Sequence, residues 1–197
     1  MNFEEIEKRI MEFVKETLKN EKVHGFDHTL RVYKLALKIA SNYGKEVDLR
    51  VLRLAALLHD VGRPYESKEG RHHALISAEI ARKILKEYGF DNDFIEKVVH
   101  AILAHSFSLR VTPRSLEAKI LSDADKLDAM GAIGIARCFM LSGARGRSLE
   151  ASINHFHEKL LKLKDLMWTE VAKRIAIDRH NFMLIFLRKL SEELNES

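Results

Sequence analysis

The sequence predicts an all-α protein, and three observations support that prediction. Only two of the 197 residues are proline, Pro64 and Pro113, and few runs alternate apolar with polar residues as strands do. Apolar residues recur instead at helical spacing along most of the chain. Because 46% of the residues are hydrophobic and 31% are charged, the chain can bury a core and is not a disordered tail. We therefore expect a single helical domain over residues 1–197.

The first two helices are marked by apolar stripes. A helix over Phe3–Leu18 carries an apolar side made of Phe3, Ile6, Ile10, Phe13 and Val14. A second helix is expected to be capped by Asp27 and to stop at Gly44.

The third helix carries the most apolar segment of the chain. Asp48 is placed to open it, and Gly62 with Pro64 is expected to end it. Residues Val51–Leu58 are apolar except for Arg53, a pattern typical of a segment surrounded by other helices. We expect this helix to be central.

The rest of the chain alternates expected helices with polar loops. In order, these are a loop over 66–71, helices over Ser77–Tyr88 and Asp93–His105, and a loop over Ser106–Arg114. A helical segment then runs from Ser115 to about Met140, and the glycine-containing stretch 142–148 interrupts the pattern after it. From Glu150 to the end there is no glycine or proline, so we expect two long helices over 150–197. The second of them is marked by Phe182, Ile185, Phe186 and Leu190.

Charge and composition exclude several classes of protein. A net charge of +4 is a weak signal for nucleic acid, so we do not expect a nucleic-acid partner. One cysteine excludes an intramolecular disulfide framework and a Cys-rich zinc module. The N-terminus is acidic where an export signal is basic, and the longest apolar run, Leu54–Leu58, is far shorter than the roughly 20 residues that span a bilayer. We expect a cytoplasmic protein that does not enter membranes.

Polar residues with metal-ligand chemistry fall on the inward side of the predicted helices. His28 lies four residues before Val32 on the apolar stripe of its helix, and His59 and Asp60 directly follow the most apolar helix. A buried carboxylate is costly unless it is paired or binds a metal. Asp125 is spaced four residues after Leu121 on an apolar face, whereas Asp123 is expected to point elsewhere. Nitrogen and oxygen donors suit Mn²⁺, Fe²⁺, Co²⁺, Ni²⁺ or Mg²⁺, and structural Zn²⁺ less clearly.

These residues also carry a resemblance to a known family. The ordered set His28, His59-Asp60 and Asp125, in the phrases HTLRV, LLHDVG and DADKLD, resembles the HD superfamily of metal-dependent phosphohydrolases over residues 24–140 or so. More narrowly, the run from Asp123 to Arg137 and the phrase HFHEKL at 155–160 resemble a small bacterial and archaeal branch that includes nucleoside-triphosphate pyrophosphohydrolases. With that branch included, the resemblance covers nearly the whole chain.

The resemblance implies an HD-type helical bundle and a set of site residues. It assigns the metal ligands to His28, His59, Asp60 and Asp125. Asp60 would both bind metal and orient the attacking water, and Asp128 would be an acceptor or base beside Asp125, or else a packing acid paired with a lysine. His73, His100 and His105 resemble histidines that hold a second metal or contact phosphate in some HD proteins. Because His100 and His105 are five residues apart, we expect only one, His105, to face the site.

Basic residues near the expected site are candidates to bind the substrate phosphates. They are Arg63, Lys68, Arg71 and Lys126. Arg145 and Arg147 form a further candidate pair, or lie in a mobile surface loop.

The leading hypothesis is a divalent-metal-dependent phosphohydrolase that acts on a nucleotide through attack of metal-bound water. A nucleoside triphosphate cut to monophosphate and pyrophosphate is the favoured reaction. The alternatives are a 5′-nucleotidase, a phosphodiesterase, a non-catalytic nucleotide sensor, or a helical scaffold with a satisfied polar core. One divalent ion is expected, with His73 and His105 as candidates for a second, and the helical surface is compatible with a homodimer.

Overall fold

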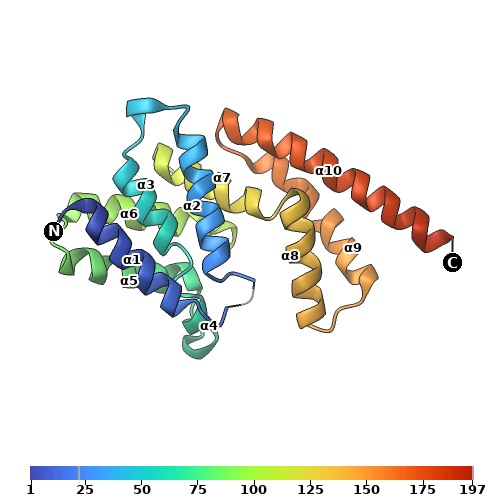
Figure 1. Ribbon diagram of the computed structural model, residues 1–197, viewed down its shortest axis with the longest axis horizontal. Coiled ribbons are helices and arrows are strands. Elements are labelled where there is room, and N and C mark those ends of the chain that lie inside the picture. Colours follow the sequence, from blue (N-terminus) through green and yellow to red (C-terminus); the bar gives the residue numbers. More distant parts are fainter. Residues whose placement is uncertain (22, 197) are drawn as a thin grey trace. The chain divides into compact units, whose positions relative to one another are not determined.

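The computed structural model describes residues 1–21 and 23–196, and within these residues it contains helices and no strand (Figure 1). The all-α prediction is confirmed. The chain divides into two compact units, Met1–Ala124 and Asp125–Ser197. The expectation of one domain over residues 1–197 stays a prediction.

The first unit is a bundle built around α3. Its elements are α1 (Phe3–Thr17), α2 (Phe26–Ala40), the 3₁₀ turn η1 (Gly44–Glu46), α3 (Leu49–Leu58), α4 (Arg63–Glu69), α5 (His73–Glu87), α6 (Asn92–His105), the 3₁₀ turn η2 (Phe107–Leu109) and the first part of α7 (Leu116–Asp128). Helix α3 packs against α1, α2, α5 and α6, and Figure 1 shows it among them. Its expected central place is therefore confirmed.

Two polar residues explain how α3 begins and how it tolerates a charge. Asp48 caps the helix, because its carboxylate accepts hydrogen bonds from the amides of Arg50 and Val51. Arg53, the polar exception in the apolar segment, pairs with Glu7 of α1, 2.7 Å from Nε to Oε1. The hydroxyl of Tyr33 on α2 donates to the same carboxylate over 2.6 Å. This ion pair joins three helices and satisfies the buried charge.

Several predicted boundaries are wrong, and local chemistry explains the differences. Helix α2 begins after Gly25, so Asp27 lies in its first turn and does not cap it. The same helix ends at Ala40, not at Gly44. The stretch 66–71 is mostly helical, because Pro64 lies at the start of α4, where its fixed φ favours a helix and its missing N–H costs nothing.

The second unit contains the end of α7 and the C-terminal helices. These are α8 (Gly131–Ala144), α9 (Leu149–Glu158), the 3₁₀ segment η3 (Leu160–Leu166) and α10 (Glu170–Asn195). Helix α10 packs against α8 and η3, and α9 packs against α8 and η3. The predicted continuous segment 115–140 breaks before Gly131, which has a φ of +67°.

Only one of the two long helices expected over 150–197 is present, because α9 is short and passes into η3. Helix α10 buries Met183 and Leu187, whereas Phe182 and Ile185 are about half exposed. Among the described residues, no single helix has both the length and the apolar character to cross a bilayer, although α7 and α8 taken together meet those two criteria.

Candidate metal centre

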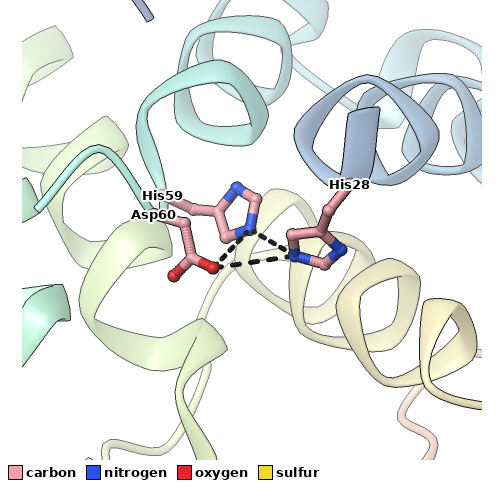
Figure 2. Close-up of side chains that lie close together, drawn as sticks. All are labelled: His28, His59 and Asp60. Atoms are coloured by element: carbon pink, nitrogen blue, oxygen red, sulfur yellow. Dashed lines mark hydrogen bonds and ion pairs between the residues drawn. The ribbon is translucent and has the colours of Figure 1, made fainter. Parts of the chain in front are cut away.

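Two helices bring an imidazole pair and a carboxylate together inside the first unit. Helix α3 ends at Leu58, so His59 and Asp60 leave its buried end, and His28 lies in the first turn of α2. All three residues are at most 1% exposed. Figure 2 shows their side chains pointing toward one another. The two Nε2 atoms are 3.4 Å apart, and Asp60 Oδ2 lies 3.6 Å from His28 Nε2 and 3.7 Å from His59 Nε2.

The other oxygen of Asp60 faces a second pair of histidines. Asp60 Oδ1 lies 3.4 Å from Nε2 of His73, at the start of α5, and 3.6 Å from Nε2 of His105, at the end of α6. Both rings are buried. The single carboxylate is thus shared by two groups of potential ligands, each with the ligand atoms within 4.8 Å of one another.

The hydrogen bonds of the Nδ1 atoms determine the tautomers of these histidines, and so which ring nitrogen presents a lone pair toward Asp60. Nδ1 of His59 lies 2.9 Å from the carbonyl oxygen of Ala56, and Nδ1 of His105 lies against the carbonyl oxygen of Ile102. Since a carbonyl only accepts, each Nδ1 carries the hydrogen, and in a neutral ring Nε2 keeps its lone pair. His73 has the same orientation, with Nδ1 donating to Glu66 over 3.0 Å. A histidine that binds a metal usually makes this kind of bond through its other nitrogen.

These side chains fit a divalent cation. Both Asp60 oxygens and His73 Nε2 are buried and have no hydrogen-bond partner among the residues that the structure describes. Acceptor atoms that face one another away from water are costly unless a proton or a cation lies between them. A divalent ion would satisfy the carboxylate and the imidazole lone pairs together.

Protonation states at neutral pH agree with that use. Burial raises the pKa of Asp60, but His59, His105 and Arg63 lower it by more, so its pKa lies well below the usual range. Burial lowers the pKa of His73 to about 4. The carboxylate is therefore charged and His73 is neutral near pH 7, as metal ligands must be.

Comparisons with known proteins identify the family. A model of the HD domain matches residues 25–130. The chain belongs to the HD-domain family. As a member of the HD superfamily, it is a metal-dependent phosphohydrolase.

Similar proteins include YpgQ of Bacillus subtilis, 37% identical over 179 residues that cover 87% of this chain and 84% of YpgQ. The crystal structure of YpgQ in complex with ADP has a TM-score of 0.80 at 32% identity, and covers 98% of this chain and 97% of the other. An HD-superfamily hydrolase from Bacillus thuringiensis has a TM-score of 0.78 at 34% identity, and both chains are fully covered. Ribonuclease Y of Cutibacterium acnes is 38% identical over 128 residues, which are 64% of this chain and 20% of that protein.

A glycine allows the HD helices to approach closely enough for His73 to reach Asp60. A Cβ atom at Gly62 would lie 2.4 Å from the carbonyl oxygen of His73, so only glycine fits between the turn and α5. The amide of Gly62 also donates to Ser77 Oγ over 2.8 Å. The turn after the HD dipeptide is thereby joined directly to the start of α5.

Of the basic residues predicted in the first loop, only Arg63 lies beside Asp60 and the histidines around it. Its Nε is 3.1 Å from Asp60 Oδ1, and its Nη1 is 3.5 Å from Glu66 Oε2. Arg71 pairs instead with Glu79 on the surface, and Lys68 is exposed on α4. A substrate contact by Lys68 or Arg71 stays a prediction.

The remaining predicted site residues, Asp125, Lys126 and Asp128, lie in the second unit, and their roles stay predictions. Asp125 is half-buried and Lys126 is buried. Asp128 pairs with Arg137, 2.8 Å from Oδ2 to Nη1, where the alternative reading expected a lysine. Asp123, expected to point to another side of the helix than Asp125, is fully buried.

Glu66 and His72 are near the site but are not indicated by the sequence. The polar stretch 66–71 predicts a loop, and no spacing rule links Glu66 to His73. His72 caps α5, since its Nδ1 accepts a hydrogen bond from the amide of Ala74. Its Nε2 lies 2.7 Å from Ser108 Oγ. His100 accepts from the amide of Arg114 and does not join the cluster around Asp60.

Proposed function

We propose that this protein hydrolyses nucleotides, and that its reaction is the cleavage of a nucleoside triphosphate to a monophosphate and pyrophosphate. The observation that carries the proposal is the buried Asp60 carboxylate, whose two oxygens face imidazole nitrogens. Neither oxygen has a hydrogen-bond partner among the described residues, although Arg63 lies beside Oδ1. The ADP bound to YpgQ, a relative aligned over 98% of this chain, supports a nucleotide as the ligand.

The proposed ligands form two groups that share Asp60. His28, His59 and Asp60 hold one divalent ion, with Asp125 assigned by the sequence pattern as the fourth ligand. Asp60, His73 and His105 hold a second. Mn²⁺, Fe²⁺, Co²⁺, Ni²⁺ and Mg²⁺ all suit nitrogen and oxygen donors of this kind.

Such an ion supplies a nucleophile from water at neutral pH and polarises a phosphoryl oxygen. The chain's own residues prepare this chemistry. The Asp60 carboxylate stays charged and orients water, while Glu66 fixes the ring of His73 through its Nδ1–H. Arg63 lies beside Asp60 with about a quarter of its side chain exposed, so its guanidinium is placed to bind a substrate phosphate. Asp128 and Lys126 are proposed as an acceptor and a phosphate contact on the basis of the sequence alone.

A second candidate is hydrolysis of a phosphodiester bond. The observation that favours it is the likeness to ribonuclease Y, although this chain spans only 20% of that protein. The net charge of +4 does not favour a long nucleic acid, so a short or cyclic nucleotide is the better diester substrate.

The test is product analysis by chromatography. Metal-free protein is reloaded with Mn²⁺, Ni²⁺, Co²⁺, Fe²⁺ or Mg²⁺ and offered nucleoside mono-, di-, tri- and cyclic phosphates and a short RNA. The proposal expects pyrophosphate and monophosphate from triphosphates, lost in Asp60→Ala and kept in Glu7→Gln, which removes a buried carboxylate charge outside the cluster. Release of inorganic phosphate from monophosphates would indicate a nucleotidase, and cleavage of cyclic nucleotides or RNA would indicate a phosphodiesterase. Binding of a nucleotide without turnover with any metal would indicate a sensor.

A further inference from the structure

A small polar cluster in the first unit joins the start of α5 to the end of α6. His73 is the first residue of α5, and His105 is the last residue of α6. The residue before His73 is His72, and the residue after His105 is Ser106. Nε2 of His72 lies 2.7 Å from Oγ of Ser108 in η2 and 3.3 Å from Oγ of Ser106, and the two hydroxyl oxygens are 3.1 Å apart. The chain neighbours of two proposed metal ligands therefore meet in one group of hydrogen bonds, which we call the α5–α6 link (His72, Ser106 and Ser108).

The cap of α5 fixes the direction of the hydrogen bonds in this link. Nδ1 of His72 accepts from the amide of Ala74 over 3.1 Å, so this nitrogen carries a lone pair. In the neutral ring the hydrogen is then on Nε2, which donates to Oγ of Ser108. The Ser108 hydroxyl can still exchange a hydrogen bond with Ser106. The ring of His72 therefore cannot turn over without losing both the cap and the bond to Ser108.

The link also lies against the ligand rings themselves. The ring centroids of His72 and His73 are 4.2 Å apart, and those of His73 and His105 are 5.8 Å apart. Nδ1 of His73 donates to Glu66, and Nδ1 of His105 donates to the carbonyl oxygen of Ile102. These two bonds orient each ring separately but do not join one ring to the other. The α5–α6 link supplies that connection.

We propose that His72 is a positioning residue, whose bonds to Ser108 and Ser106 hold the end of α6 against the start of α5. The link thereby sets the distance between the two histidine ligands of the second ion. This inference rests on the proposed function, because it takes His73 and His105 as ligands of that ion. The histidines of the first ion lie on α2 and after α3, so binding of the first ion should not depend on His72.

The test measures the two binding events separately and without substrate. Mn²⁺ is titrated calorimetrically into the metal-free full chain, and the electron paramagnetic resonance spectrum is recorded during the titration. Two Mn²⁺ ions that share one carboxylate interact magnetically, and their spectrum differs from that of an isolated ion. The spectrum therefore reports the second ion independently of protein stability and of turnover.

The variants separate the link from the cap and from general packing. His72→Asn keeps a good N-cap residue but does not extend to the position of Nε2, and Ser108→Ala removes the bond while His72 stays intact. His105→Ala is the reference for loss of a ligand. Arg82→Met is the matched control, because Arg82 of α5 pairs with Glu96 of α6 over 2.8 Å at another point where these helices meet. Thermal unfolding in EDTA checks that each variant is folded.

We expect His72→Asn and Ser108→Ala to weaken binding of the second Mn²⁺ about tenfold and to leave that of the first within about twofold. The coupled spectrum should then appear only at higher Mn²⁺ concentration, and Arg82→Met should bind both ions as the wild type does. The positioning role is refuted if both link variants keep the second ion at wild-type affinity while His105→Ala loses it. It is also refuted if Arg82→Met loses as much affinity, or if the wild type gives no coupled spectrum at saturating Mn²⁺. A wild type that binds two ions but hydrolyses no nucleotide would count against the proposed function and not against the role of His72.

Discussion

Replacement of Asp60 by asparagine is expected to remove most metal-dependent stabilisation and leave the fold intact. In the metal-free protein, the substitution removes the attraction between Asp60 Oδ1 and Arg63 Nε, which are 3.1 Å apart. At an effective dielectric constant of about 20 that attraction is about 5 kcal/mol. It also removes the cost of burying a carboxylate, which is several kcal/mol in the opposite direction. The two terms nearly cancel, so the metal-free stability should change by no more than about 2 kcal/mol.

The metal-dependent part behaves differently, because the carboxylate is shared by both groups of ligands. A metal at 100 times its dissociation constant stabilises the wild type by about 2.7 kcal/mol. For a chain of this size each kcal/mol raises the melting temperature by about 2–4 °C, which gives a shift of about 5–11 °C. If asparagine weakens binding about 100-fold, the same metal concentration equals the dissociation constant and stabilises by only about 0.4 kcal/mol, or about 1 °C.

The assay is thermal unfolding with Mn²⁺ and with EDTA. Glu7→Gln is the matched control, because Glu7 is also a buried carboxylate paired with an arginine, Arg53, but lies outside the cluster. It should lower the melting temperature and keep the full Mn²⁺ shift. If Asp60→Asn keeps the wild-type shift, or Glu7→Gln loses it, Asp60 is not the shared ligand.

Three further predictions follow from the first unit. Because the pKa of His73 is lowered to about 4 from 6.5, the unfolded chain binds a proton first, so in EDTA the free energy of unfolding should fall by about 3 kcal/mol between pH 6.5 and pH 4. Urea unfolding across that range should show this fall in the wild type and not in His73→Gln. An equal dependence of the free energy of unfolding on pH in the two proteins would contradict the prediction. Gly62→Ala should cost about 1–3 kcal/mol and reduce the Mn²⁺ shift, because its Cβ would lie 2.4 Å from a carbonyl oxygen of α5, and calorimetry that finds unchanged Mn²⁺ affinity would exclude this reasoning. Asp48→Ala should lower stability by about 1 kcal/mol through loss of the α3 cap, with metal affinity unchanged, and a melting temperature equal to that of the wild type would refute the cap.

The sequence predicted best what depends on local pattern. The apolar run before His59 indicates a buried helix and therefore places His59 and Asp60 inside, as the structure shows. The apolar stripe of α2 likewise predicts that His28 points inward, and His28 is buried. The wrong helix boundaries arise where one residue is compatible both with the end of one helix and with the start of the next. Pro64 indicates the end of α3 when it is read from the sequence, but in the structure it lies in the first turn of α4, so Glu66 is helical and not in a loop.

Contacts between distant residues could not be predicted from spacing. Glu66 becomes a partner of His73 only because Gly62 lets α5 pack on the turn after Asp60. Arg179 is 52 residues from Leu127, whose carbonyl oxygen accepts its hydrogen bond, and its side chain packs over a left-handed Gly131 that periodicity does not reveal. Asp123 illustrates the same limit, since helical spacing does not indicate that it is fully buried.

The enclosure of α3 bears on when the ion enters. Its neighbours α1, α2, α5 and α6 close around it through apolar contacts, and the charge of Arg53 is met by Glu7, so none of this requires the histidine cluster. Small zinc-binding domains, in contrast, stay unfolded until their ion arrives. We therefore expect this chain to fold before it binds its metal, and ions to exchange at a preformed site. Activity in the cell would then follow the supply of the ion, and a molecule that has lost its ion would stay folded and could bind another.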